Sequence, residues 1–366
     1  MTTYKSGQRQ ILDNAATTPV DERVFAAMAP HFCLRPANPS SQSKEGRRAA
    51  REIEDASVVI SDVTGCPGKV FFTSGATESN NWVLSRFVHS NRNAVCGATE
   101  HASVYEPVVR SGGKTVGVDG NGLIDLEDLE NHLKEGVGLV SIQAVNQETG
   151  VEQDTEAIHR ICADHGVLYH CDATQWLGKS RKKISADFVT VSAHKIHGPK
   201  GIGALICKDC SKISPLFFGG GQQDGMRAGT LNTAFIVGFS KACQLVYENL
   251  EAGDFWARKI RKTVEEFALY DGITVNSPEH SSFFLNFSVP SRAEEVISLM
   301  GRDHGLIMSR GSACSASPRV LRAMGKPESV CNNSIRVSMG RHNRKDCLDS
   351  FAHLIRACHK RAEEMP

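Results

Sequence analysis

The sequence predicts an α/β protein built on a mostly parallel sheet, and two observations support this. Short apolar runs alternate with helical patterns through most of the 366 residues, which is typical of parallel sheets packed with helices. Polar and ionisable residues directly follow several of these apolar runs. Ligands of such sheets bind beyond the carboxyl ends of the strands, so the informative motifs lie where a site is expected.

Strands are expected at residues 69–72, 94–98, 139–144, 167–171, 188–192 and 203–207. Helices are expected between and before them, at 20–32, 46–63, 77–89, 102–111, 126–134 and 155–165. A long helical pattern runs from residue 233 past 269 and is broken near Gly253. After it, strands are expected at 281–289 and 334–338, and helices at 293–300 and 344–362.

We therefore predict a large domain over residues 15–253 and a smaller α+β domain over 254–366, with residues 1–14 packing on the smaller one. A composition of 40% hydrophobic and 23% charged residues is ordinary for a globular protein, and a net charge of +1 argues against a strongly basic nucleic-acid binder. The polar first ten residues and the absence of a long apolar run predict a cytoplasmic location, where the 12 cysteines stay reduced.

The first motif is a strand, a glycine turn and a helix start at residues 70–80, Val-Phe-Phe-Thr-Ser-Gly-Ala-Thr-Glu-Ser-Asn. Backbone N–H groups at a helix start bind anions. Gly75, Ala76 and Thr77 are therefore a candidate phosphate cradle, although an ordinary helix cap uses the same residue types.

Two later strand ends carry ionisable residues. Asp172 follows an apolar strand, where a carboxylate can pair with a pyridinium nitrogen, although a metal ligand or a cap fits equally well. Lys195 follows the strand at 188–192 and could form an imine, although most lysines are surface groups. Taken together, the three segments supply a phosphate cradle, a pyridinium partner and an imine lysine, which predicts a pyridoxal-phosphate (PLP) site.

Two further residues are candidates for chemistry. His101 follows the strand at 94–98 and could stack on a planar cofactor or act as a core histidine. Cys314 lies in a loop at 308–317 that is rich in small residues, which suits an exposed nucleophile, the alternative being a buried small hydrophobe. Cys207 and Cys210 have metal-like spacing but no second pair at a suitable distance, so no metal site is expected.

These motifs resemble the cysteine desulfurases of the NifS/IscS type, which are fold-type I PLP enzymes of the class-V aminotransferase family. The resemblance runs from the Leu-Asp-Asn-Ala-Ala-Thr-Thr-Pro segment at 12–19 to the Ser-Ile-Arg-Val-Ser-Met-Gly-Arg segment at 334–341. The Gly-Ser-Ala-Cys-Ser segment at 311–315 separates desulfurases from related transaminases. The resemblance implies a seven-stranded sheet, a homodimer and conversion of L-cysteine to L-alanine, with the sulfur passed through a Cys314 persulfide to an acceptor protein. Iron–sulfur cluster assembly, tRNA thiolation and DNA phosphorothioation are the pathways it suggests.

The resemblance also implies a role for each site residue. Lys195 would bind PLP covalently and remove the α-proton of the substrate, Cys314 would attack its sulfur, and His101 would stack on the cofactor ring. Asp172 would pair with the ring nitrogen and Gln175 with the ring hydroxyl. The remaining contacts would come from Ala76, Thr77, Ser192 and His194 at the phosphate, Gln147 at the cofactor, Thr230 at the neighbouring subunit's phosphate, and Asn38 and Arg336 at the substrate carboxylate.

Three positions depart from the family pattern. Gln147 stands where an Asn is usual, the segment after Asn38 lacks the usual His, and the stretch from Cys314 to Arg322 is several residues shorter, which would limit the travel of Cys314. Two other functions remain open. One is a selenocysteine lyase or another class-V PLP lyase without an essential thiol, and the other is a non-catalytic sulfur-handling scaffold.

Overall fold

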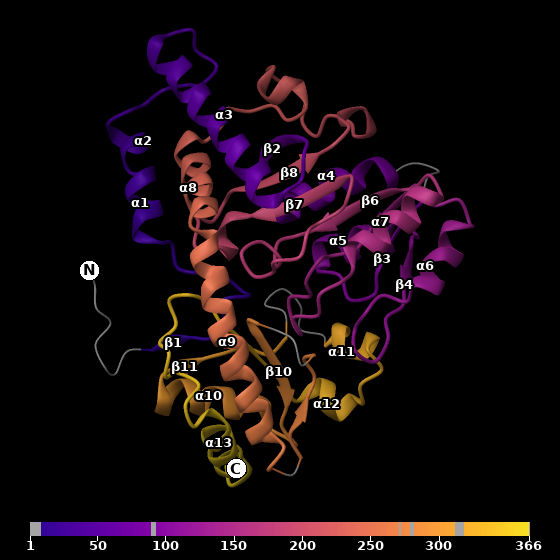
Figure 1. The fold of residues 1–366 in the computed structure, drawn as a ribbon, viewed down its shortest axis with the longest axis vertical. Helices are drawn as coiled ribbons and strands as arrows, with labels where there is room; N and C mark the ends of the chain where they lie inside the picture. Colours follow the sequence, from indigo (N-terminus) through magenta and orange to yellow (C-terminus); the bar gives the residue numbers. More distant parts are fainter. Residues whose placement is uncertain (1–8, 89–92, 271, 279–281, 312–317, 366) are drawn as a thin grey trace.

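The computed structural model describes residues 9–88, 93–270, 272–278, 282–311 and 318–365. A large sheet with its helices occupies the upper part of Figure 1, and the orange and yellow C-terminal elements occupy the lower part. Helix α9 (Val246–Phe267) runs between them. A single hydrophobic cluster includes Val189 of the large sheet and Phe287 of the lower part, so the two parts share one core.

The large sheet has seven strands, which confirms the predicted fold class. They are β2 (Lys69–Thr73), β3 (Ala94–Gly97), β4 (Lys114–Val116), β5 (Leu139–Ser141), β6 (Leu168–Asp172), β7 (Phe188–Ser192) and β8 (Gly203–Cys207). Their order is β2-β8-β7-β6-β5-β3-β4, and β8 pairs antiparallel with both β2 and β7, whereas the pairs from β7 to β4 are all parallel. The sequence did not predict β4, because an edge strand of three residues is too short to show a pattern.

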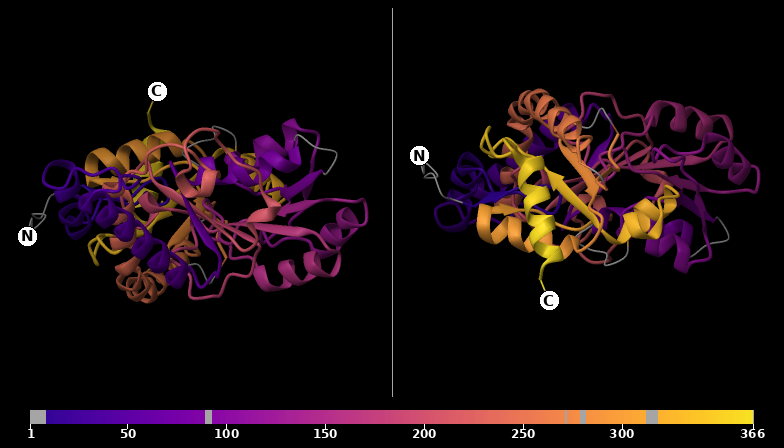
Figure 2. Two further views of the ribbon diagram at one scale, coloured as in Figure 1. Left: turned by 90° about the horizontal axis from the view of Figure 1, so that it is seen from above. Right: turned by 90° about the horizontal axis from the view of Figure 1, so that it is seen from below.

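Helices lie on both sides of this sheet when the molecule is viewed from above (Figure 2). Those that follow strands are α4 (Ala76–Val88), α5 (Ala102–Arg110), α6 (Leu126–Leu133) and α7 (Thr155–Asp164), and the others are α1 (Glu22–Met28), α2 (Pro30–Cys33), α3 (Lys44–Thr64) and α8 (Thr233–Gln244). The prediction of a single helix at 20–32 is wrong, because this stretch forms the two helices α1 and α2. Pro30 occupies the first turn of α2, where its missing N–H is tolerated, and so starts a new helix.

The predicted helix break near Gly253 is also wrong. The chain breaks at Leu245, between α8 and α9, and Gly253 lies within α9. A Cβ atom at Gly253 would lie 2.7 Å from the ring of Phe283. The glycine therefore does not end the helix. It lets the helix pack closely against the ring of Phe283. The domain boundary that we placed at this residue remains a prediction.

The C-terminal part contains a three-stranded antiparallel sheet in the order β12-β10-β9, made of β9 (Thr274–Val275), β10 (Phe284–Ser288) and β12 (Ser334–Ser338). Its helices are α10 (Ala293–His304), α11 (Arg319–Ala323), α12 (Glu328–Asn332) and α13 (Phe351–Glu363). The helix predicted at 344–362 thus starts seven residues later than expected. Ser350 precedes it in a left-handed conformation, which interrupts helical geometry.

The N-terminal end of the described chain joins this C-terminal part. Strand β1 (Gln10–Ile11) pairs in parallel with β11 (Leu306–Ile307), and Asp13 forms a bridge with Ser338. From there the chain crosses to the large sheet, where residues 15–21 contact the segment around Lys195. No helix within the described ranges has the length and apolar character needed to cross a membrane.

Candidate active site at the carboxyl ends of β6 and β7

A cavity of about 430 Å³ lies at the carboxyl ends of β6 and β7, beside the start of α4. Strand order explains its place, because these strands are neighbours and both end at this edge of the sheet. The cavity brings together most of the predicted site residues: Ala76, Thr77, His101, Gln147, Asp172, Gln175, Ser192, His194, Lys195 and Arg336.

Three predicted site residues are not placed at the cavity. Asn38 is exposed before α3, and its Oδ1 accepts a hydrogen bond of 3.0 Å from the backbone N–H of Ser40. Thr230 is exposed as well, and its predicted contact with a neighbouring subunit is not tested by a single chain. Cys314 lies in 312–317, outside the described residues.

Lys195 ends the 3₁₀ turn of residues 193–195 that directly follows β7. Its Nζ donates hydrogen bonds to the carbonyl oxygens of Ala15, at 2.5 Å, and Ala16, at 2.8 Å. The N-terminal segment therefore forms one wall around the amine. The arrangement holds Nζ at the cavity, as an imine-forming lysine requires.

The same N-terminal segment fixes the backbone on both sides of Lys195. Thr18 donates through its N–H and its hydroxyl to the carbonyl of His194, at 3.0 and 2.9 Å, and its Oγ1 accepts from the N–H of His197 at 2.7 Å. His197 has a φ of 67°, in the left-handed region that costs energy for a non-glycine residue. Thr18 thus holds the strained turn that follows Lys195.

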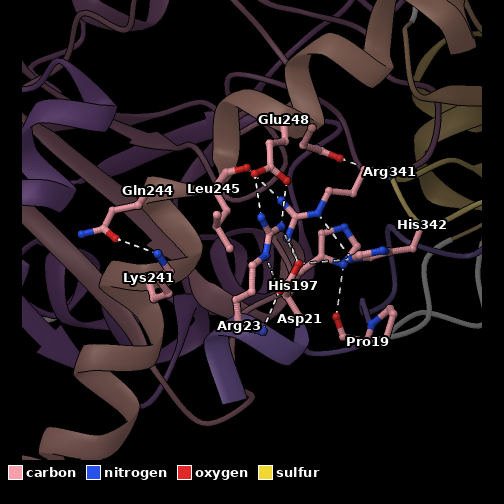
Figure 3. Close-up of polar contacts among 11 residues, drawn as sticks. Pro19, Asp21, Arg23, His197, Lys241, Gln244, Leu245, Glu248, Arg341 and His342 are labelled. Carbon is pink, nitrogen blue, oxygen red and sulfur yellow. Dashed lines mark hydrogen bonds and ion pairs between the residues drawn. The ribbon is translucent and has the colours of Figure 1, made fainter. Parts of the chain in front are cut away.

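An ionic network lies behind this turn (Figure 3). The buried carboxylate of Asp21 accepts from Arg23, at 2.9 to 3.0 Å, and from Arg341, at 2.7 Å, while Glu248 of α9 pairs with Arg23 at 2.7 Å. The hydrogen bonds from Arg23, aided by the charge of Arg341, hold the pKa of Asp21 well below its usual range. The network connects the N-terminal segment to α9 and to the C-terminal part.

His197 is the neutral member of this neighbourhood. Its ring lies 4.5 Å from that of His342, edge to face. Burial, with the positive charge of Arg341 added, lowers the pKa of His197 to about 3. Its Nδ1 lies 3.1 Å from the carbonyl oxygen of Pro19, which accepts a hydrogen bond from it. A neutral ring therefore packs against the buried arginine without repelling it.

The carboxylate of Asp172 is oriented by two donors. Its Oδ1 accepts from the backbone N–H of Thr174 at 2.9 Å, and its Oδ2 accepts from Nδ2 of Asn80 at 2.8 Å. Asn80, buried in α4, also donates to the hydroxyl of Ser103 at 2.9 Å. Sequence reasoning gave Asn80 no role; its only signal was its position one helical turn after Thr77.

The imidazole of His101 is held at the start of α5. Its Nδ1 accepts from the backbone N–H of Ser103 at 3.1 Å, so the proton of the neutral ring resides on Nε2. Burial lowers the pKa of His101, and the charges of Lys195 and Arg319 act in the same direction against the opposing effect of Asp172. The ring is therefore neutral at pH 7 and lines the cavity.

Glu100 directly precedes His101 in the chain and was not assigned a role from the sequence. Its side chain is fully buried, and its Oε1 accepts from the backbone N–H of Gln143 at 2.8 Å. Burial raises the pKa of Glu100 well above its usual range, which favours the neutral carboxyl. Arg319, the first residue of α11, donates to the backbone carbonyls of Ala98 and Glu100 and lies 3.9 Å from the centre of the Tyr105 ring.

The start of α4 fits an anion. The first N–H groups of a helix have no intrahelical acceptor, and here the first two residues of the helix, Ala76 and Thr77, line the cavity. The hydroxyl of Ser192 is buried at the same place without a partner in the described chain. A Cβ on Gly203 would lie 2.8 Å from the Cα of Gly75, so the glycine of β8 lets this turn approach the sheet.

His194 completes this end of the cavity. Its Nδ1 lies 3.1 Å from the hydroxyl of Thr17, and burial, aided by Lys195 and Lys200, lowers its pKa to about 4. The unpartnered Ser192 hydroxyl, the helix start and a neutral imidazole donor are groups that a phosphate would satisfy. The residues present thus fit the phosphate end of PLP, and Asp172 fits its ring nitrogen.

Arg336 lines the opposite side of the cavity from a buried position in β12. Its Nη2 donates to the carboxylate of Asp13 at 2.6 Å and to the hydroxyl of Ser309 at 2.9 Å, and its Nη1 donates to the carbonyl of Gln147 at 3.1 Å. Its Nε is buried without a partner in the described chain. The guanidinium is therefore rigidly placed, and its Nε–H is a donor that no acceptor in the described chain satisfies.

Comparison with known proteins identifies the family of this chain. The family described as "Aminotransferase class-V" matches residues 10–351, so the chain belongs to the class-V aminotransferase family. It is 36% identical to a protein named "Cysteine desulfurase, mitochondrial" from Arabidopsis thaliana, over 95% of this chain and 82% of that one. The chain is thus a member of the cysteine desulfurases within that family, as the sequence motifs predicted.

Solved structures give the same result. A "NIFS-LIKE PROTEIN" superposes with a TM-score of 0.87 at 32% identity, covering 98% of this chain and 100% of that one. A structure titled "SspA in complex with cysteine" superposes with a TM-score of 0.80 at 29% identity, covering 92% of this chain and 100% of that one. Both similarities extend through the large sheet and the C-terminal part.

Proposed function

We propose that this protein is a PLP-dependent cysteine desulfurase that converts L-cysteine to L-alanine. The observation that carries the proposal is the convergence of Lys195, Asp172 and the start of α4 on one cavity, with an unpartnered hydroxyl at its anion end. The structure with bound cysteine among the similar proteins supports the substrate.

The cofactor's place follows from these residues. Lys195 would bind it covalently, Asp172 would pair with its ring nitrogen, and the phosphate would rest on Ala76, Thr77, Ser192 and His194. Gln175 and Gln147 would contact its ring, and His101 would cover one face. When bound, PLP supplies an electron sink that acidifies the α-proton of an amino acid.

The remaining work belongs to the chain's own residues. Arg336 binds the substrate carboxylate through a guanidinium held by Asp13, and the Nζ of Lys195 accepts the α-proton. The thiolate of Cys314 then attacks the substrate sulfur. The S–S bond forms as the C–S bond breaks, and the former Cβ takes up a proton to give alanine. The persulfide sulfur passes from Cys314 to an acceptor protein.

A second copy of the chain is part of the proposal. Thr230 is exposed here and free to reach a neighbouring subunit's phosphate end, as in the family. Thr230→Ala should therefore weaken cofactor retention in a dimer without changing the monomer's fold.

The test of the function uses Cys314→Ser, with Cys33→Ser as the matched control, because Cys33 is an exposed cysteine outside the cavity lining. Alanine and sulfide are measured after adding L-cysteine and a thiol reductant. We expect Cys314→Ser to lose at least ~100-fold in turnover while keeping the cofactor's visible absorption, and Cys33→Ser to match wild type. Full turnover by Cys314→Ser would contradict the role of the thiol.

A further inference from the structure

Lys179 is a buried lysine close to the active site that the proposed reaction does not use. It is only 6% exposed, and no carboxylate in the described chain forms an ion pair with it. Lysines are rarely buried without an acidic partner, because taking an ammonium group out of water is costly. The position of Lys179 therefore calls for a specific role.

The contact of Lys179 is with the side chain of Gln175, four residues earlier in the same run of turns. Its Nζ donates to Oε1 of Gln175 at 2.9 Å, and the Nε2 of Gln175 donates to the carbonyl of Ala15 at 2.9 Å. In its charged form Lys179 can only donate hydrogen bonds, so the oxygen side of the amide faces it. The N–H side of Gln175 is thereby directed away from Lys179, and Gln175 lines the cavity.

The carbonyl of Ala15 links this contact to the central lysine. It accepts from Gln175 at 2.9 Å and from the Nζ of Lys195 at 2.5 Å. A chain of hydrogen bonds thus runs from Lys179 through Gln175 and Ala15 to Lys195. A lysine side-chain nitrogen lies at each end of this chain of hydrogen bonds.

We propose that Lys179 is a positioning residue of the active site, which fixes the amide of Gln175 with its N–H side toward the cofactor and lowers the proton affinity of the nitrogen at Lys195. This proposal rests on the proposed function, because it concerns the cofactor bound at Lys195. A neutral side chain at position 179 could not lower the proton affinity at Lys195 in this way.

The charges around Lys179 agree with this role. The ionisable groups that face it are Lys195 and His194, together with His197 of the following turn, and none of them is acidic. Burial, with the charge of Lys195 added, lowers the pKa of Lys179 to about 7. Because the effect is mutual, a positive charge at Lys179 disfavours a proton at Lys195.

The experiment follows the cofactor's visible absorption as a function of pH in the purified holoenzyme. Lys179→Met and Lys179→Gln remove the charge in two ways, Lys179→Arg keeps it, and Lys183→Met is the matched control on an exposed lysine of the next segment. We expect the midpoint of the absorption change to rise by about one pH unit in the Met and Gln variants. The Arg variant should stay at or below the wild-type midpoint, and Lys183→Met should match wild type.

Thermal unfolding of the cofactor-free proteins distinguishes a positioning role of Lys179 from a purely structural one. Replacing an unpaired buried ammonium with a methionine of similar size should leave the unfolding midpoint unchanged or higher. Wild-type titration midpoints in both neutral variants would overturn the inference about Lys179. A wild-type protein without any visible cofactor absorption would instead overturn the proposed function.

Discussion

The amide of Asn80 donates a 2.8 Å hydrogen bond to the carboxylate of Asp172, from a helix whose first turn forms the anion end of the same cavity. One helix therefore serves both ends of the cofactor that we propose. Its N-terminal N–H groups would bind the phosphate, and a side chain one turn later orients the carboxylate that would meet the ring. The distance between the two ends is set by the rigid rise of α4.

Asn80→Ala should weaken cofactor binding without unfolding the protein. The substitution removes one donor to Asp172, and a hydrogen bond to a charged group contributes about 1.5–3 kcal/mol, so the dissociation constant should rise at least ~10-fold. Fluorescence or absorption titration of the cofactor-free protein measures it. Asn131→Ala, on the exposed face of α6, is the control and should bind as wild type does. Wild-type affinity in Asn80→Ala would show that the hydrogen bond from Asn80 to Asp172 does not contribute to cofactor binding.

Arg341→Met should destabilise the fold more than Arg23→Met, although both arginines bind Asp21. The Arg341 side chain is 7% exposed and that of Arg23 is 49% exposed. Breaking a buried pair costs about 3–5 kcal/mol, whereas an exposed pair contributes about 1 kcal/mol or less. Urea unfolding of the two variants measures the difference. If Arg23→Met proved the more damaging, the buried network in Figure 3 would not be what holds these elements together.

The same network predicts an acid limit to stability. Pairing holds the pKa of Asp21 below its ordinary value in the folded protein, so the unfolded chain takes up this proton first as the pH falls. The contribution of Asp21 is therefore complete above the ordinary carboxyl range and is lost on acidification below it. Asp21→Asn should flatten the fall in unfolding free energy between pH 5 and pH 3; an unchanged slope would contradict this.

Glu100 should affect the unfolding free energy in the opposite direction with pH, and Glu100→Gln tests this. The folded protein keeps the Glu100 proton because burial raises its pKa, whereas the unfolded chain loses it above about pH 4.5. Stability from the neutral acid is complete at low pH and declines as the pH rises toward the folded pKa, by about 1.4 kcal/mol per pH unit. The variant avoids this loss, so its advantage over wild type in unfolding free energy should grow from pH 5 to pH 7. A constant difference would show that Glu100 is ionised in the fold.

The sequence was sufficient for those parts of the site that lie at the ends of regular elements. Asp172 and Lys195 follow apolar strands, and strand periodicity with the α/β rule brings them together. Asn80 and Lys179 could not be found in this way. Asn80 acts through Asp172, a residue of a distant segment, and Lys179 acts through Gln175, four residues earlier. Nothing in the local sequence distinguishes either from an ordinary polar residue of a helix or turn.

Gly253 shows the same limit in the fold. Glycine ends helices often enough for a break to be expected there, but the distant Phe283 decides the matter by packing against the bare backbone. Gly253→Ala should therefore destabilise the protein by about 1–3 kcal/mol through overpacking. Gly301→Ala in α10 meets only an atom at 3.9 Å and should be neutral or stabilising by up to about 1 kcal/mol. Chemical unfolding compares the two, and equal effects would contradict this role for Gly253.

The central claim is that Lys195 carries a covalently bound cofactor. The direct measurement is reduction of the purified holoenzyme with borohydride, proteolysis, and mass spectrometry of the peptides, with Lys195→Ala as the control. We expect a pyridoxyl phosphate adduct on the peptide that contains Lys195 and none in the variant, which should also lack the visible absorption. An adduct on Lys179 or Lys200, or no adduct in a protein that still releases alanine from L-cysteine, would contradict it.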